Sequence, residues 1–237
     1  METREYAKCY IAFLDMLGFK NLVKSSKCED ICTIFDNVRK PLSAMYFHGE
    51  AVIPQSTARA LRIKIMSDSI CFYIDASLHN ALFTLIMSCI IFQVNLFAFP
   101  TPVLLRGAIV HGDIYAKGDV TFGPGLTQAY MMEEHNARYP RIILTNEVLD
   151  YARREAKTSE SILNDWIFRD IDAFYTLNCL KMFLYLNENR EENICKDFLQ
   201  NIKQVLDTTT DESIREKYLY LEKVQKEHCF VKDDSHA

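Results

Sequence analysis

The segment between Asp75 and Arg106 contains no charged residue, and it constrains the fold more than any other part of the chain. Its most apolar stretch, 82–99, approaches the length of a membrane-spanning helix. Polar residues nevertheless interrupt it, and no basic cluster flanks it. The interrupting residues are Asn80, Thr84, Ser88, Gln93 and Asn95. Because Pro100 and Pro102 end the run, the pattern favours a helix of about 78–99 in a core or an interface, with no stable membrane insertion.

The composition predicts a folded chain with one sizeable core, since 49% of the 237 residues are hydrophobic and 25% are charged. The formal net charge of −5 argues against nucleic acid as a partner and against an enzyme that extends a primer. The eight cysteines form no CxxC pair, and the polar first residues do not resemble a secretion signal. We therefore expect a reduced, cytoplasmic location.

Short apolar runs alternate with segments of helical periodicity along the first two thirds of the chain. Strands are predicted at 9–14, 61–66, 70–74, 102–110, 114–122 and 141–144. Helices are predicted at about 31–46, at 78–99, after Pro124 and after Thr145. This order predicts an α+β fold with a ferredoxin-like βαββαβ core and helices on one face of the sheet.

The predicted catalytic core spans 1–157, and 158–237 is predicted to be a mostly helical extension packed on that core. Helical periodicity covers most of the extension, although 166–177 has the character of a strand. Asp170 and Asp172 alternate there with apolar residues, which favours a solvated strand face. His111 and His135 have no partner at metal-binding spacing, so we expect structural roles for both.

Two aspartates follow strand-like runs and are the main candidates for chemistry. Asp15 ends the run at 9–14, where a helix N-cap is the alternative interpretation. Asp68 lies in the turn between 61–66 and 70–74, where ordinary turn chemistry is the alternative. In a βαββαβ sheet the end of the first strand and this turn reach the same edge. Two carboxylates at one edge can bind the paired divalent cations that activate a hydroxyl for attack on phosphate.

Four motifs resemble those of a known enzyme family, the class III nucleotidyl cyclases. FLDMLGF at 13–19 resembles the first metal motif of that family, and IMSDSICFYI at 65–74 resembles the second. LLRGAIVHGDIY at 104–115 keeps the family's Arg-x-x-x-x-His-Gly pattern at Arg106, His111 and Gly112. Together with FGPGLTQAYMMEE and the following ARYPRIIL, at 122–144, these motifs are most similar to the Pycsar pyrimidine cyclases of bacterial antiphage defence.

The resemblance implies a role for each matching residue. Asp15 and Asp68 would bind two Mn²⁺ or Mg²⁺ ions, with the Met16 backbone carbonyl as a further ligand. Arg106 would act on phosphate or on the charge that develops in the transition state, a surface salt bridge being the alternative. The remaining predicted substrate contacts are Phe13, Leu17, Gly18 and Phe19 around the triphosphate, Lys64 at the base, and Ser69. The resemblance also implies a homodimer with the active site at the interface.

The chain departs from the adenylate cyclase pattern in ways that favour a pyrimidine substrate. Thr127 and Met131 stand where such enzymes carry asparagine and arginine, and Val120 stands where they carry a base-reading aspartate, with Asp119 adjacent. The base site would then have a donor at Lys64 but no acidic acceptor beside it. Such a site suits the carbonyl oxygens of uracil, so UTP is favoured and CTP remains possible. The alternatives are a catalytically silent nucleotide-binding module and an adenylate or guanylate cyclase.

Overall fold

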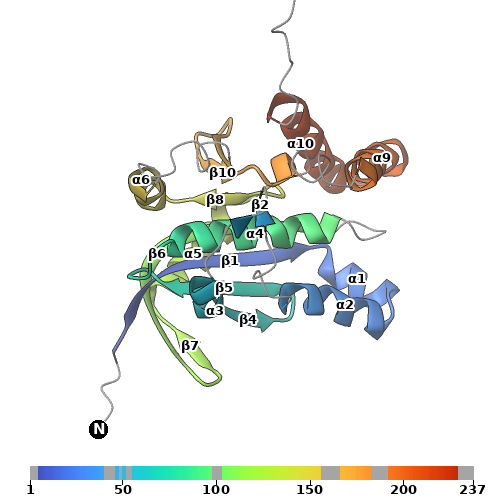
Figure 1. Ribbon diagram of the computed structural model, residues 1–237. Helices are drawn as coiled ribbons and strands as arrows, with labels where there is room; N and C mark the ends of the chain where they lie inside the picture. The colour runs from blue at the N-terminus through green and yellow to red at the C-terminus, as the bar shows by residue number, and fades with distance from the viewer. Residues whose placement is uncertain are drawn as a thin grey trace, which may run out of the picture.

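The computed structural model describes residues 5–39, 46–47, 50–51, 55–97, 103–155, 166–182 and 192–228. The division predicted between 157 and 158 falls outside these residues. The described segments form one main sheet with helices on both sides of it (Figure 1).

The main sheet has eight strands in the order β4-β5-β1-β6-β8-β10-β9, with β7 paired to β6. All pairings are antiparallel except that of β6 with β8. The strands are β1 (Ala7–Leu17), β4 (Arg62–Met66), β5 (Ser69–Asp75), β6 (Leu104–Lys117), β7 (Val120–Phe122), β8 (Ile142–Leu144), β9 (Ile167–Arg169) and β10 (Tyr175–Leu177). A separate ribbon pairs β2 (Tyr46–Phe47) with β3 (Glu50–Ala51). The predicted α+β class is confirmed.

The uncharged segment forms α4 (Ala81–Phe97), which packs on one face of the sheet. Alternate residues of β1, from Tyr10 to Met16, point into the core on that side. Among the described residues, no helix is both long and apolar enough to cross a membrane. Other helices contribute to the same core: α1 (Phe19–Ser25), α2 (Cys28–Arg39), α3 (Gln55–Ala60) and α6 (Asn146–Glu155).

The opposite face of the sheet is covered by α5 (Pro124–Asn136), so the helices do not share one face as predicted. The reason is strand alternation: Cys9, Ile11 and Phe13 are apolar as well, and they need cover on their own side. Glycines allow α5 to lie close to β6. A Cβ at Gly112 would come within 2.7 Å of the Gly125 Cα atom.

The end of the described chain adds strands as well as helices. The predicted strand character of 166–177 is confirmed, since β9 and β10 extend the main sheet beyond β8. A short 3₁₀ helix follows at Cys179–Lys181, and α9 (Glu192–Thr208) packs on α10 (Glu212–His228). These two helices lie together at one end of the molecule (Figure 1).

A buried ion-pair network holds α10 against the sheet. Arg141 precedes β8, and its Nη1 atom lies 2.5 Å from Asp170 Oδ2, while Nη2 contacts Asp172. The Tyr220 hydroxyl on α10 donates to the same Asp170 oxygen at 2.7 Å. The prediction of a solvated strand face is therefore wrong for Asp170, whose side chain is only 6% exposed in the β9–β10 turn. The pairing with Arg141 makes this burial tolerable.

The close approach of α5 to β6 is testable by substitution. We expect Gly125→Ala to lower the free energy of unfolding by about 1–3 kcal/mol, because the new methyl group would meet Ile11 and the Gly112 backbone at 2.7–3.0 Å. Gly118→Ala, at φ +58° with open space around it, should cost only the backbone strain of about 1 kcal/mol. Urea unfolding measures both. Equal costs would contradict the tight contact.

Candidate active site

Asp15 lies near the end of β1, between two neighbours fixed by strand register. It stands opposite Ser69 on β5 and opposite Arg106 on β6. Directly opposed residues of antiparallel strands project to the same face of a sheet. The three side chains therefore form a row across the middle of the sheet. This face is the one that α5 partly covers.

Asp68 reaches the same edge from the β4–β5 turn. Ser67, the residue before it, adopts φ 60°, and the Met16 N–H donates to the Asp68 carbonyl oxygen at 3.0 Å. This hydrogen bond fixes the turn to the end of β1. The sequence analysis expected the two aspartates to share an edge, and the structure places them there. Asp68 is half-buried and acts on Asp15 electrostatically.

The segment after Asp15 presents mainly backbone to this edge. The Met16 side chain points into the core on the α4 side, and Phe19 packs edge-on against Phe35 with ring centroids 5.9 Å apart. Gly18 adopts φ 78°, and its carbonyl oxygen accepts hydrogen bonds from Asn21 and Leu22 at the start of α1. Of the side chains predicted around the triphosphate here, Leu17 alone is partly exposed, so such contacts would come chiefly from backbone groups.

Two other predicted substrate contacts are occupied by protein neighbours. Lys64 reaches the tip of the β6–β7 hairpin, where its ammonium group donates to the Gly118 carbonyl oxygen at 2.5 Å. Phe13 is only 7% exposed and packs edge-on against Tyr130 of α5.

The two histidines for which structural roles were predicted both have protein partners. His111 pairs with Glu147 at 2.9 Å, and His135 lies 2.9 Å from the Met131 carbonyl oxygen.

Glu133 on α5 is a site residue that the sequence analysis did not identify. Its carboxylate oxygen Oε1 lies 2.7 Å from Arg106 Nε, which also donates to Asp15 Oδ2 at 3.1 Å. The Glu133 side chain is 3% exposed. A sequence signal existed, because Glu133 continues the four-residue spacing of Gly125 and Ala129 along the buried side of the helix.

Burial and mutual repulsion perturb both carboxyl groups that flank Arg106. Burial raises the pKa of Asp15 above its usual 3.8; the hydrogen bond and charge of Arg106 lower it, and the charge of Asp68 raises it again. Burial raises the pKa of Glu133 from 4.5 to about 7, opposed by Arg106 and reinforced by Asp15, Glu134 and Asp68. Asp15 and Glu133 thus share one partly buried arginine, with Asp68 close enough to act on both, which leaves an excess of negative charge.

This excess suits a divalent cation. Within the described part of the chain, no three His, Cys, Asp or Glu side chains lie close enough to enclose a metal by themselves. Asp15 and Asp68 nonetheless supply hard oxygen donors of the kind that Mg²⁺ and Mn²⁺ prefer. Glu133 Oε1 is ion-paired with Arg106 but receives no hydrogen bond from any described group, so the acids have fewer donors than they can accept from. The donor chemistry therefore fits the predicted cation.

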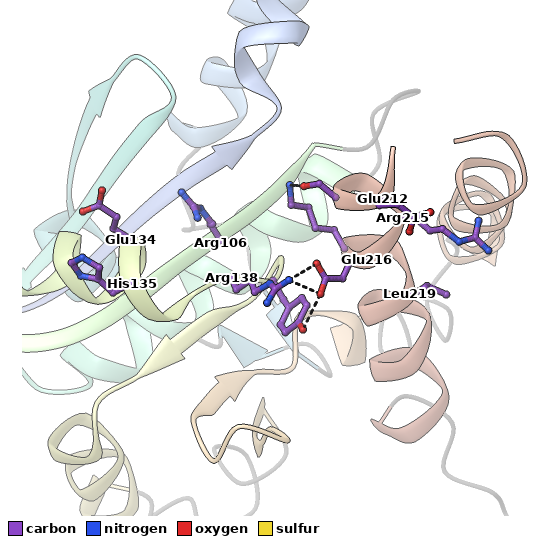
Figure 2. A pocket seen from close by; sticks show the side chains of 11 residues that line it. Arg106, Glu134, His135, Arg138, Glu212, Arg215, Glu216 and Leu219 are labelled. Carbon is purple, nitrogen blue, oxygen red and sulfur yellow. Dashed lines mark hydrogen bonds and ion pairs between the residues drawn. The ribbon is translucent and has the colours of Figure 1, made fainter. Parts of the chain in front are cut away.

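Arg106 also lines a pocket of about 840 Å³ between the end of α5 and α10. Charged residues dominate its walls, which are lined by Glu134, Arg138, Glu212, Arg215, Glu216 and Lys217 together with His135. Figure 2 shows Arg138 and Glu216 pointing toward one another, joined by contacts of 2.8 Å to both carboxylate oxygens. The pocket therefore brings residues of the far C-terminal helix next to the Asp15–Arg106–Glu133 cluster.

Similar solved structures are catalytic domains of nucleotide cyclases. The monomeric guanylyl cyclase domain of the RhoGC fusion protein from the aquatic fungus Blastocladiella emersonii aligns with a TM-score of 0.52 at 12% identity, covering 75% of this chain and 98% of that domain. The catalytic core of a rhodopsin-guanylyl cyclase with converted specificity, solved with ATPαS, aligns with a TM-score of 0.47 at 12% identity and covers 66% of this chain and 84% of that chain. An adenylate/guanylate cyclase/hydrolase from Silicibacter pomeroyi aligns with a TM-score of 0.44 at 16% identity and covers 73% of this chain and 95% of that chain.

No family model matches the chain, and no curated protein matches it. At 12% identity, the likeness to the Blastocladiella emersonii domain shows the fold. The chain thus has the fold of a nucleotide cyclase catalytic domain.

The buried Glu133 carboxyl should make stability depend on pH. Between pH 4.5 and about 7 the folded protein binds more protons at Glu133 than the unfolded chain, so this group reduces stability as pH rises through that window. At about 1.4 kcal/mol per pKa unit, the full effect is about 3 kcal/mol. We expect Glu133→Gln to become more stable relative to wild type over this range in metal-free buffer.

Urea unfolding at several pH values measures this difference. Glu134→Gln is the matched control, because it removes a carboxyl from the next position of the same helix, where the side chain is exposed. A stability difference between Glu133→Gln and wild type that does not change with pH would contradict the burial argument.

Proposed function

We propose that this chain is a metal-dependent nucleotidyl cyclase that converts a pyrimidine nucleoside triphosphate to its 3′,5′-cyclic monophosphate and pyrophosphate. One observation carries the proposal: strand register places Asp15 beside Arg106, next to the Asp68 turn, in a fold shared with a guanylyl cyclase domain. On the sequence resemblance alone, we further propose that the product is a second messenger in antiphage defence.

The chemistry asked of these residues is positioning and charge stabilisation. Asp15 and Asp68 would hold Mg²⁺ or Mn²⁺, which acidifies the 3′-hydroxyl and neutralises charge on the triphosphate. That hydroxyl would lose its proton to solvent and attack the α-phosphorus, the bond from the α-phosphorus to the bridging oxygen would break, and pyrophosphate would leave. Arg106 would stabilise the developing charge through its terminal nitrogens. These nitrogens donate no hydrogen bond to any other group in the described segments.

The preference for a pyrimidine rests on the β6–β7 hairpin and Lys64. Val120 on β7 cannot accept the exocyclic amine of adenine, and it is 56% exposed. The Lys64 ammonium group already reaches this hairpin, where a carbonyl oxygen accepts its hydrogen bond. A uracil carbonyl could take the place of the Gly118 oxygen, whereas an amine could not.

A homodimer with the site at its interface is part of the proposal. Large apolar side chains are exposed on β7, at Val120 and Phe122, and on α5, at Tyr130 and Met131. Exposed apolar patches are typical of protein interfaces. The proposed cytoplasmic location is supported by the free thiols of Cys9, Cys28, Cys32, Cys71, Cys89 and Cys179.

A catalytically silent nucleotide-binding module is the alternative that a specific observation favours. Thr127 and Met131, at the positions where adenylate cyclases carry asparagine and arginine, are exposed on α5 and cannot supply the missing arginine charge. Product analysis separates the two functions, because a silent module binds nucleotide without forming pyrophosphate.

Removal of either aspartate should abolish product. We expect Asp15→Ala and Asp68→Ala to lose detectable turnover with Mn²⁺ while remaining folded. Neither side chain belongs to the hydrophobic core, and a partly buried carboxylate reduces stability when no metal is bound to it. Thin-layer separation of products from each labelled triphosphate measures this. Asp150→Ala, on the exposed surface of α6, is the control. Wild-type turnover in either site variant would remove the metal assignment.

Base preference is tested by competing the four triphosphates in one reaction. We expect cyclic UMP as the main product, cyclic CMP at a lower level, and little cyclic AMP or GMP. An unpaired polar group in a base pocket costs about 1–3 kcal/mol, which corresponds to roughly tenfold or more in selectivity. Dominant purine products would overturn the pyrimidine assignment. Dominant cyclic CMP would overturn only the role of Lys64.

A further inference from the structure

The side chain of Arg106 faces two carboxylates with a single Nε hydrogen between them. That hydrogen is directed to Asp15 Oδ2 at 3.1 Å, in good hydrogen-bond geometry. Glu133 Oε1 is nearer to the same nitrogen, at 2.7 Å, yet it receives no hydrogen bond from any described group. The two acids therefore compete for one donor, and Glu133 is without it in this structure.

Core packing does not explain the presence of Glu133. The side chain is 3% exposed, and a buried acceptor without a donor costs about 1–3 kcal/mol. Gly125 and Ala129 precede it on the buried side of α5, so an apolar residue would continue that stripe without this cost. The adjacent Glu134 shows that the helix also offers an exposed position for a carboxylate. A state in which Glu133 has its donor would account for the arrangement.

Cation binding at Asp15 creates such a state. A carboxylate that gives its oxygens to divalent cations loses most of its capacity to accept from a guanidinium, and the cations repel Arg106. Arg106 then needs another acceptor to keep its place. Glu133 Oε1 is already 2.7 Å from Nε, so a rotation of the guanidinium group can turn the N–H toward it without moving the helix. With Nε held there, the terminal nitrogens still reach the pocket that Arg106 lines.

We propose that Glu133 is the positioning residue of Arg106, and that it accepts the Arg106 Nε–H in place of Asp15 when Asp15 binds a divalent cation. The inference rests on the proposed function for the cation at Asp15. The exchange of acceptors itself is a property of Asp15, Arg106 and Glu133. It can therefore be tested without metal or turnover.

The first experiment follows the Arg106 Nε–H resonance by ¹H–¹⁵N NMR in metal-free protein, with Arg106→Lys to assign it. Asp15→Ala removes the Asp15 acceptor altogether. We expect the resonance to remain protected from water exchange in Asp15→Ala and to be lost in Asp15→Ala/Glu133→Leu. Glu134→Gln should leave it in place. Loss in Asp15→Ala alone would overturn the proposal, even if the chain proves to be a cyclase.

The second experiment measures Mn²⁺ affinity by calorimetry in a double-mutant cycle. Glu133→Leu should weaken binding about tenfold or more, the range found for residues that orient metal-site groups. In the Arg106→Ala background the same change should have much less effect, because Glu133 acts through Arg106. Equal losses in both backgrounds would show that Glu133 acts on the cation directly or on the fold, and would overturn the proposal.

Glu133→Gln keeps the experiment decisive if the leucine variant does not fold. The glutamine oxygen can accept the Nε–H although its charge is gone. We expect Asp15→Ala/Glu133→Gln to keep the protected resonance that the leucine variant loses. A resonance lost in the glutamine variant as well would contradict the positioning role. Failure of Mn²⁺ to bind wild type would count against the proposed function and leave the NMR result standing.

Discussion

The pairing of β1 with both β5 and β6 is the constraint on which the rest of the structure depends. Its register sets Asp15 opposite Ser69 on one side and Arg106 on the other, and the Met16 N–H fixes the Asp68 turn to its end. Because β1 is apolar on both faces, it also requires a helix on each side of the sheet. The helix on the α5 side is the one that carries Glu133 into the site.

The cluster around Arg106 carries an energetic cost that the surrounding fold has to offset. Asp15 and Glu133 lie close to one arginine, and burial disfavours the charged form of both. Interactions that work against folding often mark functional sites, since selection for stability alone would remove them. Around this cluster, α4 and α5 pack against apolar strands, and the free energy gained from that burial offsets the cost of the buried carboxylates.

The order of strands and helices and the shared edge of Asp15 and Asp68 were predictable, because apolar periodicity and turn residues are local signals. The face covered by α5 was not, since it depends on the close contact of Gly112 with Gly125 across the fold. The prediction of a solvated position for Asp170 was wrong for the same reason. Alternation with apolar residues favours a solvated strand, but its partner Arg141 is 29 positions away in the chain. Pairings at such separations leave no local pattern.

Glu133 shows where the limit of sequence reasoning lies within the site. Its spacing from Gly125 and Ala129 indicates that Glu133 is buried while Glu134 beside it is exposed, yet only the structure shows its contact with Arg106. The same holds for the pocket beside Arg106, whose second wall comes from α10, more than a hundred residues along the chain. Arg106 is therefore placed by β6 through strand register and contacts α5 through Glu133, while α10 forms the far wall of the pocket that it lines. A change in β6 or α5 would alter where its charge is available.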